Sequence, residues 1–462
     1  MNTPDLENIF SHIASYSARR RAGDGVRPHH PTASYAEQLE RFRLPVQDEG
    51  APADQVIRDL IAFSEPGLAA ITGPRFHAWV MGGSNPVGVA ADWLTSLWGQ
   101  NAGNHFATPS AAAAEAQAGI ALLDLLDLPR ESSVGFVTGG TMANFTCLAA
   151  ARGEVLRRAG WDLDADGLFG APPVTIILGE EAHSTVFAAL KYLGFGAQHV
   201  AKVEVDRNGA MIPASFAHVI ARASGPVIAI AQAGQINTGA FDPFEAIVKV
   251  VKAKDGWLHV DGAFGLWGRA TPTHRHLGAG LELADSWAVD GHKWLQTPYD
   301  CGYAIVRHRE AHMRAMQIAA SYLPGAGEGA RNPSDYVPEL SRRARGFATW
   351  ALIRHFGRRR IAEMIARHCT CARRFAQRLG AEPGVEILND VVLNQVAVRF
   401  GNDELTKATI ARIQSGGVAF VGGAQWRGAW IMRISVSSEA TTEAEVDRSV
   451  EAILEAWRGV RG

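Results

Sequence analysis

The 462-residue sequence predicts an α/β protein with a mostly parallel, doubly wound large domain. Three observations support this fold class. Short apolar runs alternate with helical patterns through the middle of the chain, residues 1–70 have helical periodicity with little apolar content, and the last part mixes strands with helices. We therefore expect a helical N-terminal arm (residues 1–75), a large domain (residues 76–340) and a smaller α/β C-terminal domain (residues 341–462).

The N-terminal arm is predicted to consist of amphipathic helices. In residues 34–42 and 53–60 the apolar positions recur every three or four residues, which is the spacing of one helix face. The proline-rich run at 27–31 is a turn between helical stretches. Because the arm has too little apolar content to fold alone, we expect it to pack on its own body or on a partner subunit.

The large domain is predicted from strands that are apolar on both faces and are followed by helical patterns. Such strands are typical of a buried, mostly parallel sheet. The expected strands are residues 134–137, 175–178, 199–205, 226–231, 257–260, 286–289 and 302–306.

The second part of the chain begins with a glycine-rich polar stretch at residues 320–340, which predicts a long loop. Long helices are expected over residues 346–379. The small domain then follows from alternating strand and helix patterns. These patterns cover residues 395–400, 404–414, 429–436 and 442–457.

Composition excludes several classes of protein. A net charge of −2 and a pI near 6.8 give no basic surface for nucleic acid. No apolar run reaches the roughly 18 residues that a membrane-spanning helix needs, and the N-terminus lacks the pattern of a signal peptide. The four cysteines have no metal-ligand spacing, so we expect no metal site and a reducing, cytoplasmic location.

Residues that could take part in binding or catalysis follow the ends of several predicted strands, where open α/β sheets hold their ligands. Gly139, Gly140 and Thr141 precede a helix, where small residues and free N–H groups suit a phosphate. His183 lies at another strand-to-helix junction, and Asp261 directly follows a buried strand. Each feature alone also has an ordinary interpretation, namely a tight turn, a helix cap and an N-cap carboxylate.

Lys293 follows the predicted strand at 286–289 and lies between His292 and Trp294. In apolar surroundings an amine loses hydration, which favours its neutral, nucleophilic form. The alternative is a strand-end lysine whose ammonium group reaches water. The presence of the other strand-end residues favours a chemical role for Lys293.

One cofactor needs all of these groups. Pyridoxal 5'-phosphate requires a phosphate cradle, a lysine for its aldehyde and a carboxylate for its pyridine nitrogen, and a flat side chain on its ring helps. The turn at 139–141, Lys293, Asp261 and His183 supply these groups in that order. Asp261 would keep the pyridine nitrogen protonated, which makes the ring an electron sink.

Five short segments follow one another in an order and spacing that are specific as a set. They are AHS at 182–184, GAFDP at 239–243, HVDGA at 259–263, DGHKWL at 290–295 and SDY at 334–336. With these segments, residues 71–346, and more weakly the whole chain, resemble the pyridoxal-phosphate-dependent group II decarboxylases. These are relatives of aromatic L-amino-acid decarboxylase, within fold type I.

The resemblance implies roles around the cofactor. Lys293 would form the Schiff base, Asp261 would pair with the pyridine nitrogen, Ala263 would lie against the ring and His183 would stack over it. The positions that hold the phosphate in the family, together with the histidine before the lysine, are Gly140, Thr141, Asp290 and His292.

The resemblance also implies the reaction. An L-amino acid, with aromatic ones among the candidates, would lose carbon dioxide through an external aldimine and a quinonoid to give the amine. Tyr336 falls near the family's mobile-loop tyrosine, which protonates the α-carbon, so Lys293, Tyr336 and His183 are the expected catalytic residues. The family further implies a homodimer with shared active sites.

Departures from the family pattern leave the substrate open. The family's Gly-Thr-Thr motif is absent, and Asn237 or Thr238 takes the place of its threonine. Asp290 puts a carboxylate where a phosphate dianion is expected. Candidates for the substrate side, beside an equal interpretation as a structural turn with core aromatics, are His77, Trp79, Asn104, His105 and Phe106.

Other reactions use the same cofactor residues, because the protein selects which bond is aligned with the ring. The rivals are an oxidative aldehyde synthase, a carbon–carbon lyase and an aminotransferase. The last needs an arginine for the substrate carboxylate; Arg433 is a candidate, although a structural salt bridge is its favoured interpretation. A non-catalytic relative is the rival from another class, and intact Lys293, Asp261 and His183 argue against it.

Overall fold

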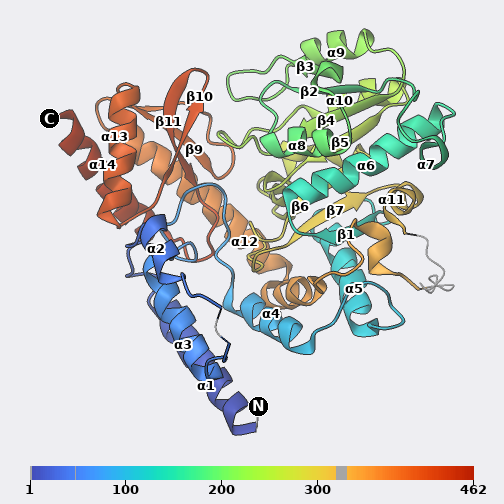
Figure 1. Cartoon of the computed structure of the whole chain (residues 1–462). Helices are drawn as coiled ribbons and strands as arrows, with labels where there is room; N and C mark the ends of the chain where they lie inside the picture. The colour runs from blue at the N-terminus through green and yellow to red at the C-terminus, as the bar shows by residue number, and fades with distance from the viewer. Residues whose placement is uncertain (1–2, 47, 319–329) are drawn as a thin grey trace.

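The computed structural model describes residues 3–46, 48–318 and 330–462 (Figure 1). Residues 320–329 of the loop expected over residues 320–340 therefore lie outside the described residues, and residues 330–340 are described. From residue 330 the chain continues into a short 3-10 helix, η6 (Pro333–Tyr336), and then reaches the long helix α12 (Gly346–Gly380).

Within the described residues, seven strands form the large sheet, in the order β1-β7-β6-β5-β4-β2-β3. Of these strands only β7 runs against its neighbours, so the mostly parallel sheet is confirmed. The strands are β1 (Ser133–Val137), β2 (Thr175–Gly179), β3 (Val200–Val203), β4 (Val227–Gln232), β5 (Trp257–Asp261), β6 (Ser286–Asp290) and β7 (Gly302–Val306).

Helices cover both faces of the large sheet, which confirms the doubly wound architecture. One face packs against α6 (Gly140–Arg158), α8 (Ser184–Tyr192) and α11 (Arg309–Met316). The other packs against α5 (Pro109–Leu125), α9 (Pro213–Ala221), α10 (Phe244–Ala253) and the first part of α12. Because both faces are buried, the strands carry apolar side chains in either direction, which accounts for their apolar runs in the sequence.

A second sheet lies in the C-terminal part, where four described strands run antiparallel in the order β10-β11-β9-β8. Its strands are β8 (Val385–Ile387), β9 (Gln395–Phe400), β10 (Gly422–Trp426) and β11 (Ala429–Ser435). Helices α13 (Asp403–Gly416) and α14 (Glu443–Arg461) and the end of α12 close its core. Figure 1 shows α12 crossing from the large sheet to this one, with a break at Gly357 where φ is 61°. We keep residues 75 and 340 as proposed domain boundaries.

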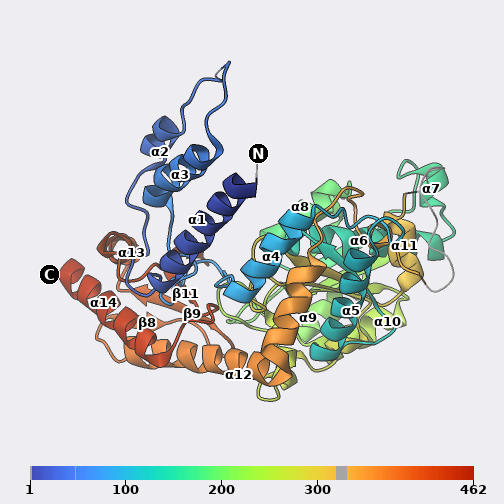
Figure 2. The ribbon, with the colours of Figure 1, turned by 90° about the horizontal axis from the view of Figure 1, so that it is seen from below.

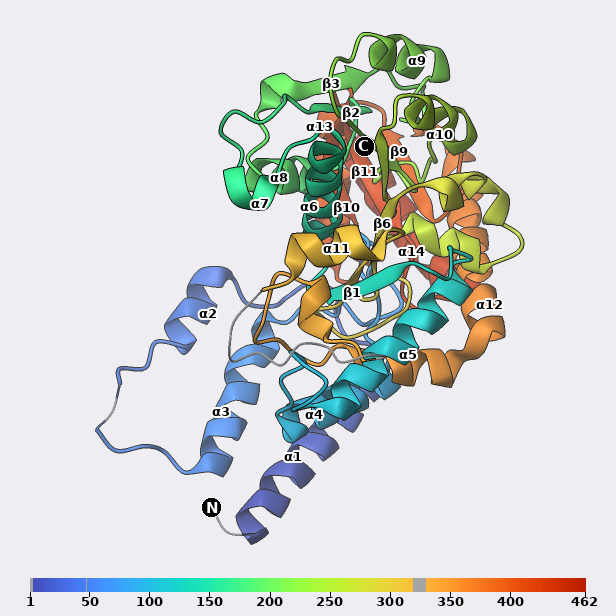
Figure 3. The same cartoon turned by 90° about the vertical axis from the view of Figure 1, so that its right-hand side faces the viewer.

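The N-terminal arm is helical as predicted, with α1 (Thr3–Ala22), α2 (Tyr35–Arg41) and α3 (Ala53–Ser64). A capping box between Ser34 and Glu37 starts α2. Neither α2 nor α3, both described in full, has a buried residue, and the arm extends away from the two sheets (Figures 2 and 3). Its apolar side chains therefore lack cover within the described chain. No helix among the described residues is long and apolar enough to cross a membrane.

Candidate active site

The predicted cofactor residues meet at one edge of the large sheet. Asp261 ends β5, Asp290 ends β6, and the turn before α6 follows β1, which runs in the same direction. Parallel strands bring their carboxyl ends to the same edge, and this edge is where such sheets bind ligands. Lys293 lies three residues beyond Asp290 and His183 caps α8. The structure thus brings together side chains that lie more than a hundred residues apart.

Asp261 is held at this edge with its carboxylate almost buried. The backbone N–H of Ala263 donates to Oδ1 at 3.2 Å, and Nδ2 of Asn144 donates to Oδ2 at 3.4 Å. Asn144 is itself fixed, because its Oδ1 lies 2.9 Å from Nε2 of His259. Burial lowers the pKa of His259 to about 3, so its ring is neutral. Sequence reasoning missed Asn144 and His259; their signal was two polar residues inside otherwise apolar segments.

Lys293 has a charged partner that the sequence did not predict. Its Nζ lies 2.8 Å from Oδ2 of Asp290, and also 6.0 Å from the ring centre of Phe264. The carboxylate is 1% exposed, while the lysine side chain is 18% exposed. The buried carboxylate is a partner that the desolvation argument from the sequence did not include. The expectation of a neutral amine stays a prediction.

The turn before α6 forms a closely packed cradle lined by two glycines. Gly139 has a φ of 156°, and a Cβ there would lie 2.9 Å from Cε1 of His292. A Cβ on Gly140 would lie 3.2 Å from Oδ2 of Asp290 and 3.6 Å from Cβ of Ala263. No side chain caps this fully described helix start, so its first N–H groups and positive dipole end stay available to an anion. This cradle, a lysine and a buried carboxylate together fit pyridoxal phosphate.

His183 does cap α8, as the ordinary interpretation of the sequence proposed. Its Nδ1 accepts a hydrogen bond from the backbone N–H of Thr185 at 3.3 Å. Burial lowers the pKa of His183, and the nearby Asp261 opposes this shift while Lys293 adds to it. The ring thus lies near both groups and is held by one nitrogen. Stacking of His183 on the cofactor stays a prediction that this placement supports.

Of the substrate-side candidates, His77 does not join this group. It is fully buried, with Nε2 3.1 Å from the Ser449 hydroxyl and its ring edge-on to Phe375. A histidine in that core cannot face a substrate. Trp79, by contrast, is 56% exposed beside Phe76 and Phe420.

The segment with Asn104, His105 and Phe106 packs elsewhere on the same chain. Nδ1 of His105 lies 2.8 Å from Oδ1 of Asn332, and Phe106 is 78% exposed. The backbone N–H of Ala107 is capped by Asn104 Oδ1 at 2.8 Å, which is the structural turn considered from the sequence. Contact of His105 and Phe106 with a substrate stays a proposal that needs a second subunit.

Tyr336 is not placed with Lys293. Its hydroxyl accepts a hydrogen bond from Nε of Arg309 at 2.7 Å, and the guanidinium of Arg331 lies 4.4 Å from its ring centre. The segment packs beside β1 and α11, and α11 follows the end of β7 that is opposite to Lys293. The phenol is thus engaged at the other edge of the sheet. Its expected part in protonating the α-carbon is not supported by this placement.

Tyr336→Phe is accordingly expected to lower the free energy of unfolding by about 1 kcal/mol, the value of one lost hydrogen bond, and to leave amine formation unchanged. Urea unfolding and product assays on the variant check this. Tyr192→Phe, at an exposed position, is the matched control. Loss of amine product at unchanged stability would restore Tyr336 as a proton donor.

Arg433, on β11, faces this site without a carboxylate partner among the described residues. Its Nη2 donates to the Ile236 carbonyl at 2.9 Å, and its buried Nε has no hydrogen bond. Burial lowers its pKa to about 10, and its charge helps to lower the pKa of His183. The salt bridge favoured from the sequence is thus absent from the described chain. A guanidinium with free donors next to the cofactor residues is a site for an anion.

The segment that departs from the family motif contributes through Ile236. The hydroxyl of Thr238 donates to the Asn208 carbonyl at 2.6 Å, and the backbone N–H of Asn237 donates to Gln235 at 2.6 Å. Thr238 therefore braces a turn. Whether Asn237 or Thr238 takes over for the family threonine stays a prediction, and the carbonyl of Ile236 is the group that meets Arg433.

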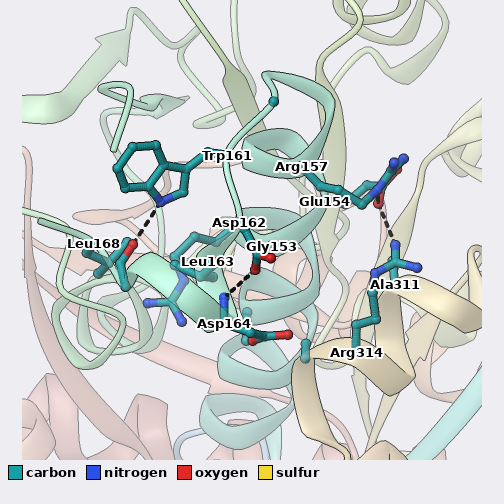
Figure 4. A pocket seen from close by; sticks show the side chains of 15 residues that line it. Gly153, Glu154, Arg157, Trp161, Asp162, Leu163, Asp164, Leu168, Ala311 and Arg314 are labelled. Atoms are coloured by element: carbon teal, nitrogen blue, oxygen red, sulfur yellow. Dashed lines mark hydrogen bonds and ion pairs between the residues drawn. The ribbon is translucent and has the colours of Figure 1, made fainter. Parts of the chain in front are cut away.

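A cavity of about 830 Å³ lies elsewhere, between α6, α7 (Leu163–Asp166) and α11 (Figure 4). Glu154 in its wall already has partners, since it accepts hydrogen bonds from Arg157 at 2.9 Å and Arg314 at 2.6 Å. It holds none of the predicted site residues. Within the described part of the chain, no group of three or more His, Cys, Asp or Glu side chains could hold a metal ion.

Comparison with known proteins agrees with the geometry. Residues 36–401 match the model of the pyridoxal-dependent decarboxylase conserved domain. Aromatic-L-amino-acid decarboxylase of Bacillus atrophaeus is 27% identical, over 84% of this chain and 82% of its own. The enzyme of that name from Sus scrofa is 25% identical over 100% and 96%. The 4-hydroxyphenylacetaldehyde synthase of Rhodiola rosea is 25% identical over 89% and 86%.

Solved structures share the fold. The Oryza sativa TDC with PLP and tryptamine has a TM-score of 0.92 at 22% identity, covering 100% of this chain and 99% of that one. Mouse CSAD has a TM-score of 0.89 at 21% identity and covers 98% of each chain. These likenesses confirm the fold type I architecture. With the family match over most of the sequence, the chain belongs to the pyridoxal-dependent decarboxylase family, whose members are pyridoxal-phosphate-dependent carboxy-lyases.

Proposed function

We propose that the protein removes the carboxylate of an L-amino acid as carbon dioxide and releases the amine. The observation that carries this proposal is the convergence of Lys293, Asp261 and the glycine cradle at one sheet edge in a member of this family. Pyridoxal phosphate supplies an electron sink for the bond that breaks next to the substrate nitrogen. The chain supplies binding, orientation and charge.

Each residue then has a defined task. Lys293 would hold the cofactor through its side-chain amine. Asp261, oriented by Asn144, keeps a proton on the pyridine nitrogen. The start of α6 holds the phosphate, and His183 covers the ring from the side of α8. Because burial lowers the pKa of His183, the neutral ring can lie over the cofactor without opposing its protonated nitrogen.

The charge of Arg433, unpaired in the described part of the chain, indicates that the substrate carries an anionic group. We propose that its free donor binds an anionic group of the substrate other than the carboxylate that leaves, because the buried guanidinium otherwise has no counter-charge among the described residues. Arg433→Gln is expected to raise KM about tenfold to a hundredfold, the cost of losing one buried charged pair, while cofactor binding is unchanged. Steady-state kinetics and cofactor titration measure this.

The control for Arg433 is Arg399→Gln on the neighbouring strand β9. Arg399 already donates to Asp403 at 3.2 Å, so its loss should not change KM. An unchanged KM in Arg433→Gln would contradict a role in substrate binding. An equal rise in both variants would indicate a general disturbance of the small sheet.

Arg433 also favours a second candidate function. An arginine that fixes the α-carboxylate is what an aminotransferase needs, because the carboxylate is then kept rather than broken off. The relatives add a third outcome, since some are aldehyde synthases. A panel of L-amino acids separates these reactions. Amine and carbon dioxide in equal amounts support the proposal, ammonia with hydrogen peroxide indicates an aldehyde synthase, and a keto acid without carbon dioxide indicates transamination.

We further propose a homodimer whose second copy covers the arm. The exposed apolar side chains of the arm and of α4 (Pro86–Trp98) support it, because a soluble surface rarely leaves so many uncovered. They include Leu6, Phe10, Leu39, Phe42, Leu60, Leu97 and Trp98. The mass of the protein in solution tests this. The four cysteines are free and buried, and the cytoplasmic location stays a prediction.

A further inference from the structure

The carboxylate of Asp290 is only partly satisfied at the cofactor edge. It is 1% exposed, and its Oδ1 has no hydrogen-bond partner among the described residues. Its Oδ2 meets Nζ of Lys293 at 2.8 Å and lies 3.7 Å from Nε2 of His292. A buried carboxylate with one free oxygen depends on this lysine for its charge balance.

His292 cannot replace the lysine as counter-charge. Burial is the largest effect on its pKa and lowers it, although Asp290 opposes the shift. Its Nδ1 accepts a hydrogen bond from the backbone N–H of Cys301 at 3.2 Å, which leaves the N–H on the nitrogen that faces Asp290. The ring is therefore a neutral neighbour. In the chain as it stands, the lysine ammonium is the charge that neutralises Asp290.

Among the described residues, the other elements around Asp290 add no positively charged side chain, and the start of α6 contributes only the positive end of its dipole. From β7 comes the Tyr303 phenol, whose pKa burial raises well above its ordinary value, and Asp290 adds to that shift. Burial and Asp290 likewise raise the pKa of Tyr299 in the segment before β7. His183 responds to Asp290 only weakly, as the last of its influences. The start of α6 presents Gly139 and Gly140, which do not titrate.

The same carboxylate borders the cradle that would hold the phosphate. Its oxygens lie 3.2 to 3.6 Å from the positions that Cβ atoms would take on Gly139 and Gly140. A phosphate that reaches this turn brings further negative charge to a group that water does not reach. Like charges at such a site favour protonation of one of them. The arriving phosphate thus favours a neutral Asp290.

We propose that Asp290 holds Lys293 as the ammonium before the cofactor arrives and accepts its proton when the cofactor is captured. The proton moves from Nζ to Oδ2. The neutral amine then attacks the aldehyde carbon, a C–N bond forms, and the aldehyde oxygen leaves as water with the two remaining amine hydrogens. The carboxylate is left neutral beside the phosphate. This role rests on Lys293 being the residue that carries the cofactor, as proposed above.

The proposal predicts that capture depends on the phosphate. Pyridoxal, which has the aldehyde but no phosphate, does not favour protonation of Asp290, so the wild-type chain freed of cofactor should capture it slowly. Asp290→Asn releases the lysine from its ion pair. Without the carboxylate 2.8 Å from Nζ, capture of pyridoxal at pH 8 should become about tenfold faster or more. Capture of pyridoxal phosphate should change less.

The rates are measured by absorbance after mixing the cofactor-free full chain with pyridoxal or pyridoxal phosphate. Borohydride reduction and peptide mass then identify the modified lysine. Asp300→Asn is the matched control, because Asp300 lies in the same loop and pairs with Arg345 at 2.9 Å instead of with Lys293. Asp290→Ser gives a second removal of the charge in case the asparagine variant folds poorly.

Equal or slower capture of pyridoxal by both Asp290 variants would overturn the proposal, as would an equal gain in Asp300→Asn. Failure of the proposed function gives a different result. If the reduced label is found on a lysine other than Lys293, the assignment of the cofactor lysine fails. If the label is on Lys293 and the capture rates do not respond to Asp290, the function stands and this inference does not.

Discussion

Replacing Lys293 by alanine is expected to abolish covalent attachment of pyridoxal phosphate and to lower turnover by about a thousandfold or more, because the nucleophile is removed outright. The measurement is the absorbance of the attached cofactor, followed by borohydride reduction and mass of the intact chain. Lys191→Ala, an exposed lysine at the end of α8, should leave both unchanged.

The alanine variant also leaves Asp290 buried without its counter-charge, which alone can destabilise a fold. The double variant with Asp290→Asn removes that carboxylate and separates stability from chemistry. A cofactor that stays covalently attached in both variants would contradict the assignment of Lys293.

Asp261→Asn is expected to lower kcat by about a hundredfold to a thousandfold, the range found when one preorganised electrostatic partner of a transition state is lost. The amide keeps the shape of the side chain but not its charge, so the pyridine nitrogen loses the group that holds its proton. Attachment through Lys293 should persist. Turnover and cofactor titration measured on one preparation test both statements.

The matched control is Asp255→Asn, a surface carboxylate at the end of α10 that faces Arg158 at 3.3 Å. A kcat within twofold of wild type in Asp261→Asn would rule out the pairing with the pyridine nitrogen. A variant that no longer binds the cofactor at all would place Asp261 in binding and not in the electron sink.

Much of the fold could be predicted from the sequence, because buried parallel strands leave a plain signal. Each of the expected strands from 134–137 to 302–306 overlaps an observed one. The cofactor residues could be predicted for a related reason. The carboxyl ends of parallel strands lie at one edge of the sheet. The positions of Lys293, Asp261 and Gly140 at such strand ends were therefore enough to predict that these residues meet.

The sequence could not show which side chains contact one another. The ion pair of Lys293 with Asp290 depends on how the loop after β6 turns back, and desolvation alone pointed to a neutral amine. His77 and Tyr336 became candidates because of their neighbours in the sequence. In the structure, however, His77 contacts Ser449 and Tyr336 accepts a hydrogen bond from Arg309. For Arg433 a structural salt bridge was the favoured interpretation, whereas the structure gives it the Ile236 carbonyl as a partner.

The break in α12 at Gly357 has a consequence for how the two halves of the site work together. Lys293 and Asp261 lie at the large sheet, whereas Arg433 lies on the small one. Helix α12 connects the two sheets. A substrate bound through its nitrogen at the large sheet and through a second, anionic group at Arg433 would connect the two halves. Molecules of the wrong length would miss one of the two contacts, so helix α12 and its break at Gly357 would set the length of substrate that the site accepts.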